Sequence, residues 1–148
     1  MENGEPIKIP PRRYIKVLPP NASPRSLVTP TARISLAEKN LEDYIVQQLD
    51  TIETGLSLVD RQLHTPAGRL DLLCRDAAGN YVVVELKKHF GTDEAVGQTL
   101  RYMGWVMEKY PNHNVRGIVI VGKKDEQLRY AIKAAQGVEA KEFRISIE

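Results

Sequence analysis

Alternating apolar and polar residues mark two neighbouring strands near the middle of this 148-residue chain. From residue 68 to residue 75, leucine and cysteine at every second position give the period of a half-buried strand. Residues 76–80 contain the Asp, Gly and Asn that are typical of turns. Residues 81–86 are then mostly β-branched or aromatic, as strand residues are. The pattern predicts a β-hairpin.

The same pattern predicts which residues of the hairpin face each other. If the chain turns about Ala78, Asp71 lies opposite Glu85. Cross-strand neighbours on one face of a sheet are about 4.5–5.5 Å apart at Cβ. Lys87 is two residues beyond Glu85 and therefore points to the same side. We expect three charged side chains on one face of the hairpin and apolar side chains on the other.

This charged face suits the hydrolysis of phosphodiester bonds. Two carboxylates at the edge of a sheet offer the hard oxygen ligands that Mg²⁺ prefers. A bound metal lowers the pKa of a coordinated water and stabilises negative charge on phosphate. Lys87 would orient that water or neutralise the developing charge. Without such a task the cluster would be costly, because neighbouring carboxylates repel each other.

The remaining chain is predicted to alternate between helices and strands. Periodicity and capping residues predict three helices, at 35–49, 92–110 and 126–135. Apolar runs predict three further strands, at 56–64, 115–121 and 138–147, with a turn at 122–125. The order α-β-β-β-α-β-α-β predicts an α/β fold with a mixed central sheet flanked by helices.

Two of the predicted helices contain recognisable capping, core and border residues. In the first, Ser35 and Glu38 fit a capping box, and the inward stripe contains Leu41, Ile45 and Leu49. In the second, Gln98 and Tyr102 lie one turn apart at the border of the apolar arc. That arc is predicted to consist of Val96, Leu100, Met103, Val106, Met107 and Tyr110.

Residues 1–33 are predicted to form a proline-rich basic arm, and residues 34–148 the folded domain. Seven of the nine prolines lie in this arm, which excludes helix and central strand there. Short apolar pieces at 14–18 and 26–28 are candidates for an edge strand. The arm has six basic and two acidic residues, whereas the whole chain is +2. A solvated tail, a nucleic-acid-binding segment and a subunit-embracing arm all fit this charge.

The composition narrows the class of protein. A hydrophobic fraction of 42% and a charged fraction of 27% are typical of a soluble globular domain. No apolar run is long enough to span a membrane, and no signal peptide is visible. The single cysteine, Cys74, fits a core position and a reducing, cytoplasmic setting. His64, His89 and His113 have no metal-ligand spacing, so zinc is not expected, and His64 is expected at the surface.

The hairpin and its flanks resemble a known family of nucleases. Asp71, followed after thirteen residues by Glu85-Leu86-Lys87, resembles the PD-(D/E)xK motif. The closer resemblance is to the C-terminal nuclease domain of NucS/EndoMS-type mismatch endonucleases, over about residues 35–135. It rests on Thr65-Pro-Ala-Gly-Arg-Leu-Asp, Val82-Val-Val-Glu-Leu-Lys and Gln98-Thr-Leu-Arg-Tyr-Met.

The resemblance implies a restriction-endonuclease-like fold and a metal-dependent deoxyribonuclease that uses Mg²⁺ or Mn²⁺. Asp71, Glu85 and the backbone carbonyl of Leu86 would bind the metal, and Lys87 would act on water or phosphate. In the family, a glutamate on the first helix completes the metal site. Glu38 matches it best by position, with Glu42 as the alternative.

Further roles and partners are also expected. Gln98 and Tyr102 match the family's glutamine and tyrosine, which would orient water or phosphate. DNA is the expected partner, in repair or in the processing of branched or mismatched DNA. A homodimer is expected because cutting both strands of a duplex takes two sites.

The family also has a feature that this chain does not match. NucS/EndoMS proteins carry a separate N-terminal DNA-binding domain where this chain has a short arm, so mismatch recognition is not carried over. Another protein that supplies DNA targeting is therefore a further expected partner. The competing hypothesis is a non-catalytic nuclease-fold subunit that binds DNA or a larger assembly. Intact Asp71, Glu85 and Lys87 argue against it.

Overall fold

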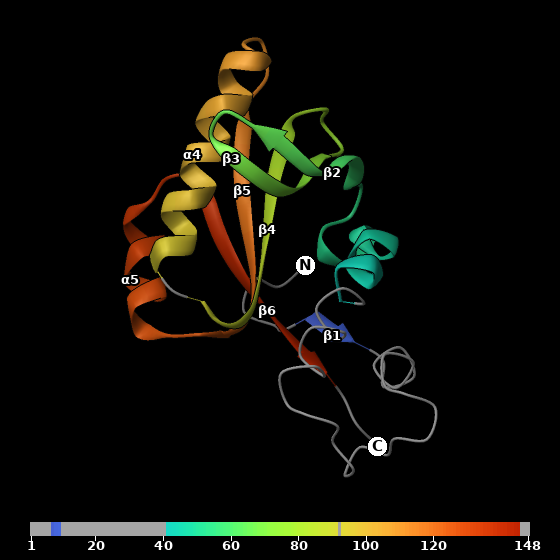
Figure 1. Cartoon of the computed structure of the whole chain (residues 1–148). Helices are drawn as coiled ribbons and strands as arrows, with labels where there is room; N and C mark the ends of the chain where they lie inside the picture. Colours follow the sequence, from blue (N-terminus) through green and yellow to red (C-terminus); the bar gives the residue numbers. More distant parts are fainter. Residues whose placement is uncertain (1–6, 10–40, 92, 146–148) are drawn as a thin grey trace.

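A computed structural model describes residues 7–9, 41–91 and 93–145, and the structural statements below concern these residues. Six strands form one mixed sheet in the order β1-β6-β5-β4-β3-β2 (Figure 1). They are β1 (Ile7–Ile9), β2 (Ser57–Thr65), β3 (Gly68–Arg75), β4 (Tyr81–Gly91), β5 (Val115–Lys124) and β6 (Val138–Ile145). The described helices are α3 (Leu49–Ile52), α4 (Asp93–Lys109) and α5 (Glu126–Ala134), together with a helical segment at residues 41–47.

The sheet changes from antiparallel to parallel at β4. β2 pairs antiparallel with β3, and β3 pairs antiparallel with β4. From β4 onward the pairs β4–β5, β5–β6 and β6–β1 are all parallel. This mixed α/β arrangement confirms the predicted fold class.

The β3–β4 hairpin has the predicted register. Leu72 pairs with Val84, and Arg75 pairs with Tyr81. Gly79 in the turn has a φ of 86°, a conformation that glycine adopts without steric cost. The ladder between these strands ends at the Leu72–Val84 pair. The charged residues of the predicted site begin immediately beyond it.

Helices cover both faces of the sheet, as Figure 1 shows. On one face, residues 41–52 pack against β3, β4 and β5 through a cluster that includes Leu41, Ile45 and Leu49. On the other face, α4 and α5 pack against the same strands. Parallel strands covered on both sides read as continuous apolar runs, which explains the buried stretch 117–121 of β5. Cys74 is fully buried, and burial raises the pKa of its thiol to about 12, as suits a core residue.

The first helix differs from its prediction. It is interrupted at Gln48 and continues as α3 to Ile52, three residues past the predicted end. Ile52 is fully buried, and its carbonyl accepts a hydrogen bond of 3.1 Å from Lys141 Nζ, so packing and hydrogen bonding favour the extension. The predicted capping residues Ser35 and Glu38 lie outside the described residues.

The predicted inner face of α4 was partly wrong. Leu100 and Met107 are 41% and 46% exposed, whereas Thr99 and Tyr102 are buried. The helix is turned this way because Gly117 of β5 makes room for it. A Cβ added at Gly117 would come within 2.5 Å of the Thr99 methyl group.

Two strands extend further than the sequence predicted. β4 continues to Gly91, and β5 continues to Lys124, where a turn was expected at 122–125. The two extensions pair with each other, since Phe90 lies opposite Lys123 and Gly91 opposite Lys124. Each extension therefore provides backbone hydrogen-bonding partners for the other extension. The sequence of neither strand alone reveals this pairing.

Part of the predicted arm belongs to the sheet. Ile7–Ile9 forms β1 and pairs with the end of β6, with Ile7 opposite Phe143. An edge position suits a segment flanked by prolines. The candidate edge strands at 14–18 and 26–28 lie outside the described residues.

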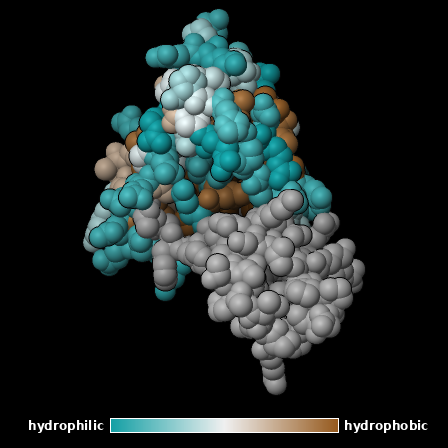
Figure 2. Space-filling view, in the orientation of Figure 1, coloured by the Kyte–Doolittle hydropathy of each residue, from teal (hydrophilic) through white to brown (hydrophobic). Residues whose placement is uncertain are grey.

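The surface agrees with a globular domain. In the view of Figure 2 it is mainly hydrophilic, with a few apolar patches. Among the described residues, no helix is long and apolar enough to cross a membrane.

Candidate functional site

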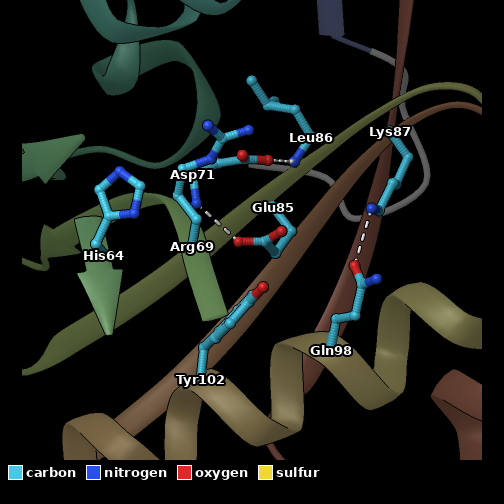
Figure 3. A pocket seen from close by; sticks show the side chains of 8 residues that line it. All are labelled: His64, Arg69, Asp71, Glu85, Leu86, Lys87, Gln98 and Tyr102. Atoms are coloured by element: carbon cyan, nitrogen blue, oxygen red, sulfur yellow. Dashed lines mark hydrogen bonds between the residues drawn. The ribbon is translucent and has the colours of Figure 1, made fainter. Parts of the chain in front are cut away.

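The charged face of the hairpin lines a hollow of about 450 Å³ between the sheet and α4 (Figure 3). Eight residues line it: His64, Arg69, Asp71, Glu85, Leu86, Lys87, Gln98 and Tyr102. Six of these are residues that the sequence selected, so the structure brings most of the predicted site together. Two further residues were selected from the sequence as candidate acids. Glu42 lies near Asp71 and is connected to it through Gln62, and Glu38 is outside the described residues.

Asp71 and Glu85 cross-link the strands where the β3–β4 ladder has ended. The backbone N–H of Asp71 donates to Glu85 Oε2 at 2.9 Å. In return, the backbone N–H of Leu86 donates to Asp71 Oδ2 at 2.9 Å. Each carboxylate thus accepts a hydrogen bond from the opposite strand (Figure 3). This reciprocal pair holds both acids at one place on the sheet.

Burial and mutual repulsion make it difficult for both acids to be ionised. The Glu85 residue is only 3% exposed. Burial and then the negative charge of Asp71 raise the pKa of Glu85 to about 8. The pKa of Asp71 is also raised, chiefly by burial, although the Leu86 N–H opposes the shift. A divalent cation beside the pair would offset this cost and stabilise both carboxylates in their charged form.

The donors at this place fit a hard cation such as Mg²⁺ or Mn²⁺. The side chains of Asp71 and Glu85 and the backbone carbonyl of Leu86 all offer oxygen. Among the described residues, no group of three or more His, Cys, Asp or Glu side chains gathers around one metal position. Mg²⁺ typically binds through one or two carboxylates and completes its shell with water and phosphate oxygens. The two acids therefore suffice for such an ion.

Lys87 and Gln98 connect β4 with α4 at one side of the hollow. Lys87 Nζ donates to Gln98 Oε1 at 2.9 Å. Gln98 was expected to project from α4 toward the face that carries Glu85 and Lys87, and this hydrogen bond shows that its amide does so. The hydrogen bond restrains the ammonium group beside Glu85, so a positive charge stands next to the two acids.

Tyr102 reaches the hollow one helical turn after Gln98. Its side chain is almost fully buried and lies against the start of β3. Gly68 there has a φ of 121°, and a Cβ at this position would come 3.0 Å from the Tyr102 hydroxyl oxygen. The left-handed backbone therefore favours glycine at residue 68, and the Tyr102 ring leaves little room there for a larger residue.

Two lining residues were not selected from the sequence. His64 and Arg69 pair across β2 and β3, and Figure 3 shows them opposite Lys87 and Gln98. Arg69 belongs to the motif that carries the resemblance, but nothing in its spacing distinguished it from a solvated arginine. The hollow is acidic at its centre and has basic residues on two sides.

Gln62 and Glu42 lie next to Asp71 but are not among the residues that line the hollow. Gln62 Nε2 lies 3.0 Å from Glu42 Oε1 and 3.4 Å from Asp71 Oδ1. Glu42 also accepts a hydrogen bond of 3.0 Å from Arg61 Nε. Glu42, the alternative accessory acid, is thus one side chain away from Asp71. No motif or spacing in the sequence pointed to Gln62.

We expect Glu85→Gln to stabilise the metal-free protein at high pH. The pKa of Glu85 is about 8 in the fold against an ordinary 4.5, so the folded chain alone holds this proton between those values. Stability should therefore fall as pH rises from about 4.5 to about 8. Melting temperatures in EDTA at pH 5 and pH 9 test this, and the variant should exceed the parent by roughly 5 °C at pH 9.

Glu108→Gln is the matched control, because Glu108 is exposed on α4 and outside the hollow. Its melting temperature should follow that of the parent at both pH values. Equal pH dependence in the parent and in Glu85→Gln would contradict the assignment of the buried proton to Glu85.

The structure defines an α/β domain in which a mixed sheet presents an acidic hairpin to a helix across a hollow. Residues 37–145 match the family described as the Endonuclease NucS C-terminal domain. The chain belongs to this family, which confirms the resemblance drawn from its motifs.

Individual relatives agree with the family match. Endonuclease NucS of Sulfolobus acidocaldarius is 37% identical over 83 residues, which cover 56% of this chain and 32% of that protein. Endonuclease NucS of Parafrankia sp. is 36% identical over 103 residues, which cover 69% and 46%. The chain thus spans about a third to a half of the length of these relatives.

Solved structures show the same fold. A repair endonuclease from Pyrococcus abyssi has a TM-score of 0.62 and 30% identity, covering 74% of this chain and 46% of that one. An EndoMS–dsDNA complex has a TM-score of 0.62 and 27% identity, covering 74% and 44%. Both likenesses support the α/β nuclease fold.

Proposed function

We propose that this chain is a metal-dependent DNA endonuclease domain that hydrolyses phosphodiester bonds in DNA repair. The observation that carries the proposal is the meeting of Asp71, Glu85 and Lys87 in one hollow, where burial penalises the two acids unless a cation joins them. The family supports the proposal, since its matched members are named endonucleases.

Asp71, Glu85 and the Leu86 carbonyl would hold Mg²⁺ or Mn²⁺. The metal, when bound, lowers the pKa of a coordinated water and stabilises charge on the phosphate. Lys87 would donate from Nζ to the attacking water or to a phosphate oxygen, and its hydrogen bond to Gln98 fixes where that donor stands. Positioning the donor in advance reduces the reorganisation needed during the reaction.

The other lining residues would bind and orient the DNA backbone. The Tyr102 hydroxyl would donate to water or phosphate from the α4 side. Arg69 would bind a neighbouring phosphate through its planar guanidinium group, with His64 beside it. Glu42 would serve as the accessory acid, and its link to Asp71 through Gln62 supports this role, while Glu38 lies outside the described residues.

The substrate and the assembly are proposed by extension. One solved relative is a complex of EndoMS with dsDNA, and we extend the binding of duplex DNA to this chain. One site cuts one strand, so we propose a homodimer for cutting both strands. We also propose a partner that directs the domain to its DNA. Sedimentation at concentrations above those used for cleavage tests the dimer.

The direct test is a cleavage assay on single-stranded, duplex, branched and mismatched DNA. Each substrate is incubated with Mg²⁺, with Mn²⁺ and with EDTA. We expect cleavage of at least one substrate with metal and none in EDTA. DNA binding without any cleavage would instead support the non-catalytic subunit.

We expect the basic residues of the arm to supply DNA affinity. The arm carries the positive excess of the chain, while residues 34–148 are net negative. Removing one basic side chain that binds a phosphate should lower the slope of log affinity against log salt by roughly one unit. The measurement compares the parent with a variant that keeps β1 but replaces four basic residues by glutamine: Arg12, Arg13, Lys16 and Arg25.

A double variant of α5, Arg129→Gln with Lys133→Gln, is the control for removal of charge elsewhere. Its salt slope should change less than that of the arm variant, and the turnover of saturated enzyme should be unchanged in both. Parallel slopes for parent and arm variant would assign the arm to contact with a subunit or partner.

A further inference from the structure

Gln62 has a backbone conformation that is rare in a strand. Among the described residues other than glycine, it is the one with a positive φ, at 50°. This left-handed region is unfavourable for residues that carry a Cβ. A residue keeps such a conformation when the surrounding structure imposes it, and functional sites are where these cases concentrate.

A β-bulge brings Gln62 opposite Asp71. The pairing of β2 with β3 shifts by one residue at Val59, which has no partner in β3. Beyond the shift, the two neighbours of Gln62 pair with the two neighbours of Asp71, so these residues face each other. In the register before the bulge, Arg61 would face Asp71 instead. The bulge therefore exchanges an arginine for an amide beside the acid.

The amide of Gln62 serves two carboxylates at once. Its two N–H bonds can point in different directions, and Nε2 contacts both Glu42 Oε1 and Asp71 Oδ1. Asp71 Oδ2 accepts the Leu86 N–H, so the carboxylate is held from β2 at one oxygen and from β4 at the other. Arg61, which precedes Gln62 in β2, donates a hydrogen bond to Glu42.

We infer that Gln62 is a positioning residue for Asp71. The bulge and the left-handed backbone aim its amide so that the Asp71 carboxylate keeps one orientation toward the cation, with Glu42 fixed alongside. The inference rests on the proposed function, since it assigns Asp71 to the metal. In this role Gln62 donates a hydrogen bond to the ligand Asp71 and is not itself assigned to the metal.

Two variants separate the side chain from the backbone. Gln62→Met keeps the length of the side chain but has no N–H donor. Gln62→Gly also has no donor, but it adopts a positive φ without strain, so it should fold at least as well as the parent. Gln127→Met is the matched control, because Gln127 is exposed on α5.

Mn²⁺ alone is the probe for the first measurement. Its binding to the full chain without DNA is followed by calorimetry, and melting temperatures are taken in EDTA. Loss of a group that orients a metal ligand typically weakens metal affinity about 10- to 100-fold. We expect about a tenfold weaker Mn²⁺ affinity in both Gln62 variants, with Gln62→Gly no less stable than the parent and Gln127→Met unchanged.

DNA cleavage against metal concentration is the second measurement. The metal midpoint should rise in both Gln62 variants by about the same factor as the dissociation constant. Turnover at saturating metal should change much less. A purely structural role would lower the melting temperature without moving the midpoint.

Failure of the inference differs from failure of the proposed function. If the parent binds Mn²⁺ and cuts DNA, but Gln62→Gly does so at the same metal concentrations, the positioning role is wrong and the proposed function stands. If the parent neither binds Mn²⁺ nor cuts any DNA substrate, both are overturned.

Discussion

Asp71→Asn is expected to reduce metal-dependent DNA cleavage by about a thousandfold or more while leaving the fold intact. The substitution removes a charged metal ligand, and a metal supplies several kcal/mol of charge stabilisation in such a reaction. The carboxamide oxygen of asparagine can still accept the Leu86 N–H that Asp71 Oδ2 accepts in the parent. Chemistry and folding should therefore separate in this variant.

The melting temperature supplies the second half of this test. Asp71 contributes to the repulsion that raises the pKa of Glu85, so the metal-free variant should be as stable as the parent or more stable. Asp60→Asn is the matched control, since Asp60 is exposed on β2 and outside the hollow. An Asp71→Asn protein that is unfolded, or that cuts at the parental rate, would refute the catalytic assignment.

The hairpin could be predicted because several local signals coincide in it. Alternation set the faces of β3, the turn residues set the centre of the loop, and together they determined the pairing. The observed pairing of Leu72 with Val84 follows from that centre. Since side chains alternate along a strand, the register also determined that Asp71, Glu85 and Lys87 line one hollow. Local periodicity thus sufficed for the centre of the site.

Contacts between distant parts of the chain could not be predicted in this way. The role of Gln62 depends on the bulge at Val59. One additional residue in a strand cannot be recognised from a short alternating sequence pattern. The orientation of α4 depends on the space left by Gly117, which lies in a strand further along the chain. The contact between β1 and β6 joins opposite ends of the sequence. Each of these features is decided by packing between elements rather than within one.

The two candidate accessory acids also depend on contacts between elements. Counting back from Asp71 favoured Glu38, which lies outside the described residues, so its role stays a prediction. The described structure shows Glu42 linked to Asp71 through Gln62. This link joins the first helix, β2 and β3, and the spacing within one helix does not reveal it.

The second large effect is expected for Lys87→Met, which should lower turnover by about a hundredfold and leave the metal midpoint near its parental value. An ammonium group does not bind a cation, so its removal should affect charge development in the reaction more than metal affinity. Methionine keeps the aliphatic stem between β4 and α4 but cannot donate to Gln98 Oε1, the partner of Nζ at 2.9 Å.

Gln98→Leu separates the charge of Lys87 from its position. In this variant the ammonium group remains but has no acceptor on α4 to hold it, so turnover should fall by less than in Lys87→Met. Lys133→Met, on the exposed side of α5, controls for the removal of one surface charge. Cleavage rates are measured across a metal titration for all three variants. If Lys87→Met turns over at the parental rate but requires more metal, Lys87 acts only as an electrostatic neighbour of the two acids, and the donor to water or phosphate must be sought in Tyr102 or Arg69.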